Sequence, residues 1–315
     1  MEEKRALAWE MLNEMNQVLL GKKAFTFQVL ASLLADGHVL LEDIPGVGKT
    51  TLAVAVSRMM GFSWKRVQFT PDVLPSDLTG FTMYNRDIQQ FVYQPGIVFC
   101  NLLLADEINR TSPKTQSALL EVMEERQVTV DGETRKVPSP FFVIATQNPP
   151  GTLGTQRLPE AQMDRFLVSL TIGYPDFENE VKMAKEVNDG MRGEKAKTLM
   201  DANIVKEMQR AVQGVYIHDK IYEYIVKLIE ATRNHPDLEM GVSPRGTIAL
   251  VKMARAAAWL SGQDFVSTLD VCGQFLAVTR HRVQLSRRAE MEEKKREDIL
   301  KEILESVEKP LFRKK

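Results

Sequence analysis

Cysteine and histidine are both scarce in this sequence. The 315 residues include two cysteines, Cys100 and Cys272, and four histidines. The cysteines are far apart and the histidines are scattered, so neither a disulfide scaffold nor a zinc site is indicated. Cys100 ends the apolar run GIVFC, where a buried free thiol is expected. We therefore expect a reduced, cytoplasmic protein.

Long apolar runs are missing as well. No run approaches the roughly 20 apolar residues that a membrane-spanning helix requires. The first twenty residues, MEEKRALAWEMLNEMNQVLL, are charged and amphipathic. We therefore expect neither a signal peptide nor insertion into a membrane.

The sequence has no excess of either charge. Lysine and arginine number 41, aspartate and glutamate 42, and the net charge is −1. The basic footprint of a nucleic-acid-binding domain is therefore absent, which gives little support to a nucleic-acid partner. The hydrophobic share of 44% and the charged share of 26% are ordinary for globular proteins. The length suffices for about two domains.

Predicted strands and helices alternate through the first half of the sequence. A helix is predicted over residues 49–60, and another begins at Ser112 and Pro113, a cap followed by proline in the first turn. Apolar runs predict strands at residues 38–42, 66–70, 101–107, 141–148 and 167–172. This alternation predicts an α/β fold in which a parallel sheet is sandwiched by helices.

The second half is predicted to be helical. We place the boundary near Pro175, with a core domain over residues 1–175 and an all-α domain over residues 176–315. The stretch from Arg287 to Lys309 predicts one solvated helix, because acidic residues precede lysines by four positions. These pairs are Glu290–Lys294, Glu297–Lys301 and Glu305–Lys309.

The stretch LLEDIPGVGKTTLA, residues 40–53, contains most of a phosphate-binding pattern. Asp43 stands where that pattern has its first glycine. Lys49 is expected to contact the β- and γ-phosphates of ATP, and Thr50 to ligate Mg²⁺. The residues expected to hold ATP or ADP here are Pro45, Gly46, Val47, Gly48, Lys49, Thr50 and Thr51.

Two carboxylates end the apolar strand LLLADE. Ligands bind at the carboxyl ends of parallel strands, which brings Asp106 and Glu107 to the expected phosphate site. Asp106 is expected in the Mg²⁺ shell, through a water molecule, and Glu107 as the base that deprotonates the attacking water. Asn148, at the end of the next strand, is expected to donate to the γ-phosphate or to that water.

Two arginines complete the set of candidate catalytic residues. Arg165 lies in LPEAQMDRF, where it could form a structural salt bridge or reach the γ-phosphate of a neighbouring subunit. Arg245 lies in GVSPRG at the start of a predicted helix, where it could act on the nucleotide or serve as a capping or interface residue.

Together these stretches resemble the AAA+ ATPases, specifically the MoxR branch. The resemblance rests on GHVLLEDIPGVGKTTLA, LLLADEINR, ALLEVMEERQVTVDG, VIATQNP, LPEAQMDRF and GVSPRG, in that order. It implies an AAA+ phosphate-loop core followed by an all-α lid, with Asn148 as first sensor, Arg165 as trans-acting arginine finger and Arg245 as second sensor. The form LLEDIPG looks common in this branch, so Asp43 puts little in doubt.

The resemblance also implies three further features. Residues 77–96 and about 127–138 resemble two hairpin inserts of the clade that contains magnesium chelatase subunits and minichromosome-maintenance helicases. The segment VLLG implies adenine contacts at Leu20 and Gly21. Four aromatic residues of the first insert could grip a partner or pack across the hairpin: Phe81, Tyr84, Phe91 and Tyr93.

The function implied by the resemblance is ATP hydrolysis by a ring, hexameric in this family, that remodels or matures other proteins. The implied partners carry von Willebrand factor A domains, with metal insertion as one such role. A nucleic-acid-stimulated motor is the alternative, and a small-molecule kinase would share the phosphate loop without explaining Asn148, Arg165 and the helical domain together.

Overall fold

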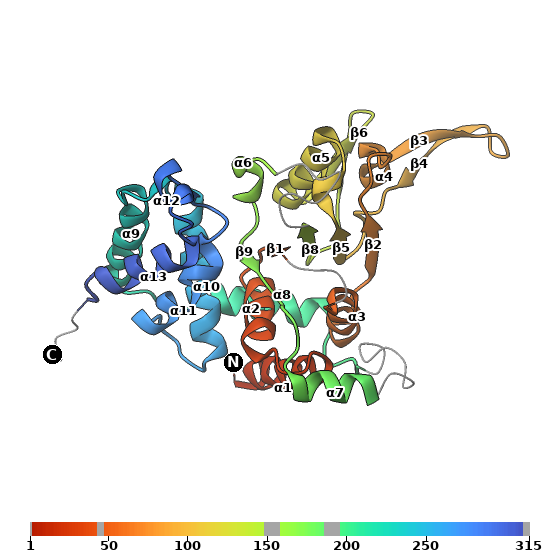
Figure 1. Ribbon diagram of the computed structural model, residues 1–315. Coiled ribbons are helices and arrows are strands. Elements are labelled where there is room, and N and C mark those ends of the chain that lie inside the picture. Colours follow the sequence, from red (N-terminus) through yellow and green to blue (C-terminus); the bar gives the residue numbers. More distant parts are fainter. Residues whose placement is uncertain (1, 43–46, 148–157, 186–195, 311–315) are drawn as a thin grey trace.

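The computed structural model describes residues 2–42, 47–147, 158–185 and 196–310. Pro45, Gly46 and Asn148, which have predicted roles, lie outside the described residues, as does Asp43. Figure 1 shows a central sheet with helices on both sides, a group of helices at one end and a long hairpin projecting at the other. The predicted fold class, an α/β core with a helical lid, is confirmed.

The central sheet has five parallel strands in the order β2-β5-β8-β1-β9. Their bounds are β1 Val39–Glu42, β2 Trp64–Gln68, β5 Leu102–Asp106, β8 Phe142–Gln147 and β9 Val168–Leu170. All five predicted strands are present. The edge strand β2 lies two residues before its predicted position, because its apolar content is low and its burial alternates along the strand.

Both faces of the sheet are buried. In β1, Val39 and Leu41 belong to the cluster that includes residues of α1–α3, whereas Leu40 packs with Leu119 of α5 on the other face. This alternation follows from the two-residue period of a strand. The covering helices are α1 Glu2–Val18, α2 Lys23–Leu34, α3 Lys49–Met59 and α5 Pro113–Glu125.

Two antiparallel hairpins leave the core. After the short helix α4, Pro75–Thr79, the first hairpin pairs β3 Gly80–Asn85 with β4 Gln90–Pro95. The second pairs β6 Gln127–Val130 with β7 Glu133–Lys136. Its turn residues Asp131 and Gly132 both have positive φ, as the tight hairpin turn requires.

The aromatic residues of the first hairpin divide into two kinds. Tyr84 and Phe91 are paired across the strands with ring centroids 5.4 Å apart, yet Phe91 remains 75% exposed. Tyr93 lies under the guanidinium of Arg135, 4.0 Å from the ring centroid, and so joins the two hairpins. Tyr93 is therefore a packing residue, whereas Phe81, Tyr84 and Phe91 pack in part and expose the rest of their surface.

Five helices of the second half lie at the end of the molecule opposite the projecting hairpin (Figure 1): α9 Asp219–Arg233, α10 Pro244–Leu260, α11 Thr268–Thr279, α12 Arg287–Met291 and α13 Arg296–Ser306. The helix before them, α8 Ala202–Gln213, lies beside α2. Two short helices, α6 Glu160–Met163 and α7 Phe177–Lys185, flank β9. A small ribbon of β10 Leu238–Met240 and β11 Gln284–Leu285 was not expected in this region.

One predicted helix is broken in the structure. The stretch from Arg287 to Lys309 was expected to be continuous, but α12 ends at Met291 and α13 begins at Arg296. The break lets Lys294 reach Asp237, with Nζ 2.6 Å from Oδ2, instead of pairing along a helix. Arg288 contacts the other oxygen of Asp237, also at 2.6 Å. These hydrogen bonds lower the pKa of Asp237 to about 2.

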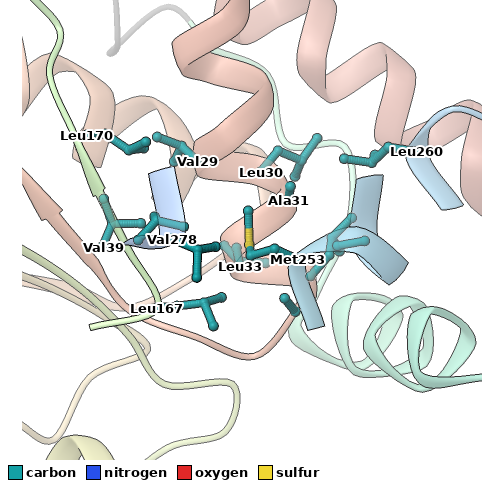
Figure 2. Packing of buried hydrophobic residues seen from close by; sticks show 14 of the residues in the cluster. Val29, Leu30, Ala31, Leu33, Val39, Leu167, Leu170, Met253, Leu260 and Val278 are labelled. Atoms are coloured by element: carbon teal, nitrogen blue, oxygen red, sulfur yellow. The ribbon is translucent and has the colours of Figure 1, made fainter. Parts of the chain in front are cut away.

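The lid and the sheet share one hydrophobic cluster. Figure 2 shows its centre, where Val29 and Leu30 of α2 lie between β9 and the lid helices. On the lid side this cluster includes Met253 of α10 and Val278 of α11. Because α2 contributes to both sides, the lid is fixed against the core by a continuous apolar contact.

Two buried histidines form hydrogen bonds that join separate parts of the chain. Val143 N–H donates to Nδ1 of His38 at 3.0 Å, so Nε2 carries the proton and donates to the Met123 carbonyl at 3.0 Å. In the lid, Nε2 of His281 donates to the Phe166 carbonyl at 3.1 Å, while its Nδ1 has no hydrogen-bond partner. Burial holds the pKa of each histidine well below its usual value.

We expect the free energy of unfolding to fall as the pH drops below about 6.5, the unfolded pKa of histidine. His38 and His281 stay neutral in the folded protein, so at these two positions the unfolded chain binds more protons than the folded one. Each histidine therefore lowers the free energy of unfolding by up to about 1.4 kcal/mol for each pH unit of acidification. Urea unfolding at several pH values between 7.5 and 5.5 measures how the free energy of unfolding changes with pH. A His38→Gln variant should show a smaller change. An identical slope in that variant would contradict the assignment.

Candidate active site

The predicted phosphate-binding turn connects β1 to α3. Within the described part of this turn, Gly48 has φ 99°, a left-handed conformation that glycine favours, and α3 begins at Lys49. The first turn of a helix presents N–H groups that the helix's own hydrogen bonds do not use, and this end of a helix suits an anion. Lys49 and Thr50 are half-buried in that first turn.

The segment with the predicted adenine contacts lies beside this turn. A side chain on Gly48 would come within 3.2 Å of Cδ2 of Leu19, so Leu19 packs directly on the turn. Leu20 and Gly21 follow, and Gly21 has φ 72°. A Cβ on Gly21 would meet Nδ2 of Asn179 at 2.5 Å, so α7 closes over this glycine. The sequence analysis did not single out Leu19.

Asp106 lies at the carboxyl end of β5 and is 7% exposed. Nε of Arg66, on the neighbouring strand β2, donates to Oδ2 of Asp106 at 2.7 Å. The hydroxyl of Thr146, on β8, lies 3.4 Å from Oδ1. The carboxylate is therefore held by side chains from both adjacent strands.

Glu107 is held in place by a different set of contacts. Its backbone has φ 58°, and its N–H donates to the Thr146 hydroxyl at 2.8 Å. Nη1 of Arg110 donates to Oε2 of Glu107 at 2.7 Å. The side chain is mostly buried, with 22% exposure. Arg110 and Thr146 thus orient the backbone and the carboxylate of the predicted base.

The two predicted arginines meet at one carboxylate, that of Glu124 on α5. Nη1 of Arg165 lies 2.9 Å from Oε2 of Glu124 and also donates to the Leu120 carbonyl at 3.1 Å. Nη2 of Arg245, on α10, lies 2.6 Å from Oε1 of Glu124. We call Arg165 and Arg245 the arginine pair. All three side chains are between 34% and 44% exposed.

The arginine pair lies at the end of β1 opposite the phosphate-binding turn. A cavity of about 220 Å³ is lined by the pair and by Gly37 and His38, which precede β1. The Leu167 N–H also donates to the His38 carbonyl at 2.8 Å. A four-residue strand is about 13 Å long. The structure therefore brings the two arginines together but separates them from Lys49 of the same subunit.

Five residues with contacts in the site were missed by the sequence analysis: Leu19, Arg66, Arg110, Glu124 and Thr146. For Arg165, the salt bridge considered earlier exists, but its partner is Glu124 rather than the adjacent Asp164. Asp164 instead pairs with Arg282 of the lid at 2.7 Å.

Neither a membrane-spanning helix nor a metal-binding cluster of side chains is found in the described ranges. No helix there is long and apolar enough to cross a bilayer. No group of three or more His, Cys, Asp or Glu side chains is placed there to hold a metal ion.

An AAA+ ATPase is defined by a five-stranded parallel sheet, a glycine–lysine–threonine turn after β1, an acidic pair at the carboxyl end of β5 and a helical lid. The comparisons agree. Residues 38–168 match the ATPase family associated with various cellular activities, and residues 230–303 match the AAA lid domain.

Similar proteins cover nearly the whole chain. The uncharacterized protein YeaC of Bacillus subtilis is 47% identical over 99% of this chain and 98% of its own. Chaperone MoxR1 of Mycobacterium tuberculosis is 37% identical over 94% of this chain and 81% of its own. A crystal structure of a provisionally assigned ATPase from Cytophaga hutchinsonii superposes with a TM-score of 0.91 at 34% identity, over 98% of this chain and 96% of that one. This chain belongs to the MoxR family of AAA+ ATPases.

Proposed function

We propose that this protein hydrolyses ATP at sites shared between neighbouring subunits of a ring, and that the cycle remodels or matures a partner protein. The observation that carries the proposal is the position of the arginine pair. Arg165 and Arg245 lie at the far end of β1 from Lys49, on an exposed surface, and share one counter-ion. Arginines placed there serve a nucleotide bound by another copy of the chain.

The phosphate-binding turn takes the triphosphate. Lys49 neutralises charge on the β- and γ-phosphates, and the N–H groups at the start of α3 donate to phosphate oxygens. Leu20 and Gly21, beside Leu19, provide the adenine side. Pro45, Gly46, Val47, Gly48, Thr50 and Thr51 complete the loop.

The donor set also fits Mg²⁺. This ion prefers oxygen ligands and keeps several waters, and both the Thr50 hydroxyl and the Asp106 carboxylate supply oxygen. In the sheet, β5 and β1 are separated by β8, a spacing of about 10 Å, so Asp106 is suited to contact through a bound water. When bound, the ion neutralises charge on the β- and γ-phosphates.

Glu107 accepts the proton of the attacking water as that water bonds to the γ-phosphorus and the bond to the leaving oxygen of ADP breaks. Arg110 and Thr146 hold the carboxylate and its backbone in place. Asn148, which follows β8, orients the water or the γ-phosphate. The neighbour's Arg165 and Arg245 stabilise the charge on the transferring phosphoryl group.

The proposed biological role is based on the names of similar proteins. The name Chaperone MoxR1 describes a protein that acts on other proteins. We propose the same class of work here, in a hexameric ring, with von Willebrand factor A domain proteins as clients and metal insertion as one role. A salt-sensitive stimulation of ATP hydrolysis by DNA would instead favour a nucleic-acid motor.

Replacing Lys49 with alanine should abolish measurable ATP binding, because the principal positive charge on the β- and γ-phosphates is removed. Isothermal titration calorimetry with ATP measures this. Lys227→Ala, an exposed lysine on the lid helix α9, is the matched control and should bind ATP normally. Equal affinity in Lys49→Ala and the control would overturn the site.

A further inference from the structure

A buried arginine of the lid, Arg282, contacts the chain segment that carries Arg165. Arg282 follows α11, and its side chain is 2% exposed. Its Nε donates to Oδ1 of Asp164 at 2.7 Å, and its Nη2 donates to the Asp164 carbonyl at 3.1 Å. Its Nη1 donates to the Leu167 carbonyl at 3.1 Å. The guanidinium therefore bonds to both ends of the segment from Asp164 to Leu167.

Asp164 also holds the helix that carries Arg245. Its second carboxylate oxygen, Oδ2, accepts from the Ser243 hydroxyl at 2.7 Å. Ser243 is the N-cap of α10, and Arg245 is in the first turn of that helix. The carboxylate of Asp164 therefore holds the chain next to both arginines of the pair. Asp164 itself lies one residue before Arg165, and its partner Ser243 lies two residues before Arg245.

The lid residue two positions earlier contacts the other end of the sheet. Nη1 of Arg280 donates to the Thr171 hydroxyl at 3.2 Å, and Nη2 lies 4.0 Å from Oε2 of Glu42 and 3.1 Å from Glu297. Glu42 is the last residue of β1 before the phosphate-binding turn. Arg280 and Arg282, two residues apart in the lid, therefore contact two separate places: Glu42 at the nucleotide-side end of β1, and the segment from Asp164 to Leu167 that carries Arg165.

We propose that Asp164 and Arg282 are positioning residues that place the arginine pair for the neighbouring subunit's ATP. Through these residues, the lid sets how effectively a subunit supplies its arginines to its neighbour. This inference rests on the proposed function. A planar guanidinium with several fixed donors can brace a turn in one orientation, which a lysine cannot do. A displacement of about 1 Å in a catalytic group can cost about 10²-fold in rate.

The test separates the two roles of a subunit by mixing variants. Arg165→Ala subunits keep an intact nucleotide site but cannot donate, so they serve as acceptors. Lys49→Ala subunits keep the arginine pair, so they serve as donors. Phosphate release is measured for acceptors mixed with Lys49→Ala, with Lys49→Ala/Asp164→Asn, or with Lys49→Ala/Arg280→Gln, after native mass spectrometry has established that mixed oligomers form.

Lys49→Ala donors should restore hydrolysis. Donors that also carry Asp164→Asn should restore about 10²-fold less, because the carboxylate that braces the pair has lost its charge. Donors with Arg280→Gln should restore as well as Lys49→Ala. In the converse mixture, Asp164→Asn acceptors served by Lys49→Ala donors should hydrolyse ATP normally and bind it with unchanged affinity.

Equal restoration by donors with and without Asp164→Asn would overturn the positioning role while leaving trans donation intact. An equal loss as donor and as acceptor would reduce Asp164 to a general structural residue. If Lys49→Ala itself restores nothing, trans donation is wrong and the inference falls with it. Should Asp164→Asn fail to fold, Ser243→Ala removes the other contact of the same carboxylate and should give a smaller loss confined to the donor role.

Discussion

An Arg165→Ala variant should hydrolyse ATP about 10³–10⁵-fold more slowly than the unmodified protein, the range measured for arginine fingers. Its ATP affinity should be unchanged, because Arg165 lies at the opposite end of β1 from Lys49. Steady-state phosphate release and ATP titration measure the two quantities. Arg287→Ala, at an exposed position at the start of α12, is the matched control and should lose neither.

The same variant tests whether the arginine acts between subunits. Specific activity of the unmodified protein should rise with its concentration as subunits associate. Mixing Arg165→Ala with Lys49→Ala subunits should recover activity at interfaces where an intact arginine faces an intact phosphate loop. A dilute monomer with full activity, or a mixed oligomer that stays inactive, would leave Arg165 as a salt-bridge partner of Glu124.

A Glu107→Gln variant should bind ATP and turn it over about 10²–10⁴-fold more slowly, the usual contribution of a general base. The amide cannot take the proton of water, while Asp106, with its contacts to Arg66 and Thr146, stays in place. Single-turnover phosphate release after ATP binding measures the chemical step directly.

Glu230→Gln, an exposed residue of α9, is the control for replacing a carboxylate elsewhere. Turnover close to that control would show that Glu107 is not the base. A loss of ATP binding in Glu107→Gln would instead indicate that the residue supports the nucleotide site as a whole. A variant that holds ATP without hydrolysing it would also capture a client protein for identification.

The strands and the central helices could be predicted because their signals are local. The apolar run before Asp106, and the serine–proline cap of α5, report their structure within a few residues. The break between α12 and α13 could not be predicted, because its cause is Asp237, which lies outside the charged stretch and attracts both Arg288 and Lys294. The tertiary contact of Lys294 with Asp237 replaced the expected Glu290–Lys294 pair, and such a pair along a helix is worth about 0.2–0.5 kcal/mol.

The residues around the site show the same division. Lys49, Asp106 and Glu107 stand in local patterns after apolar strands. Glu124 gives no such signal, because its role depends on two arginines that come from distant elements and meet at its carboxylate. The roles of all the predicted site residues stay predictions, and Pro45, Gly46 and Asn148 also lie outside the described residues.

Under the proposed donation of arginines between subunits, the placement of the arginine pair limits the symmetry of a working assembly. Each subunit presents a phosphate-binding turn at one end of β1 and Arg165 with Arg245 at the other, so productive contact joins two different surfaces. An isologous two-fold dimer would set like surface against like and complete neither site. Head-to-tail contact must instead close by rotation or continue as an open helix. In an open helix, the subunit at one end would have no neighbour to supply Arg165 and Arg245 to its ATP site. The fraction of ATP sites that have these arginines would therefore distinguish a closed ring from an open helix.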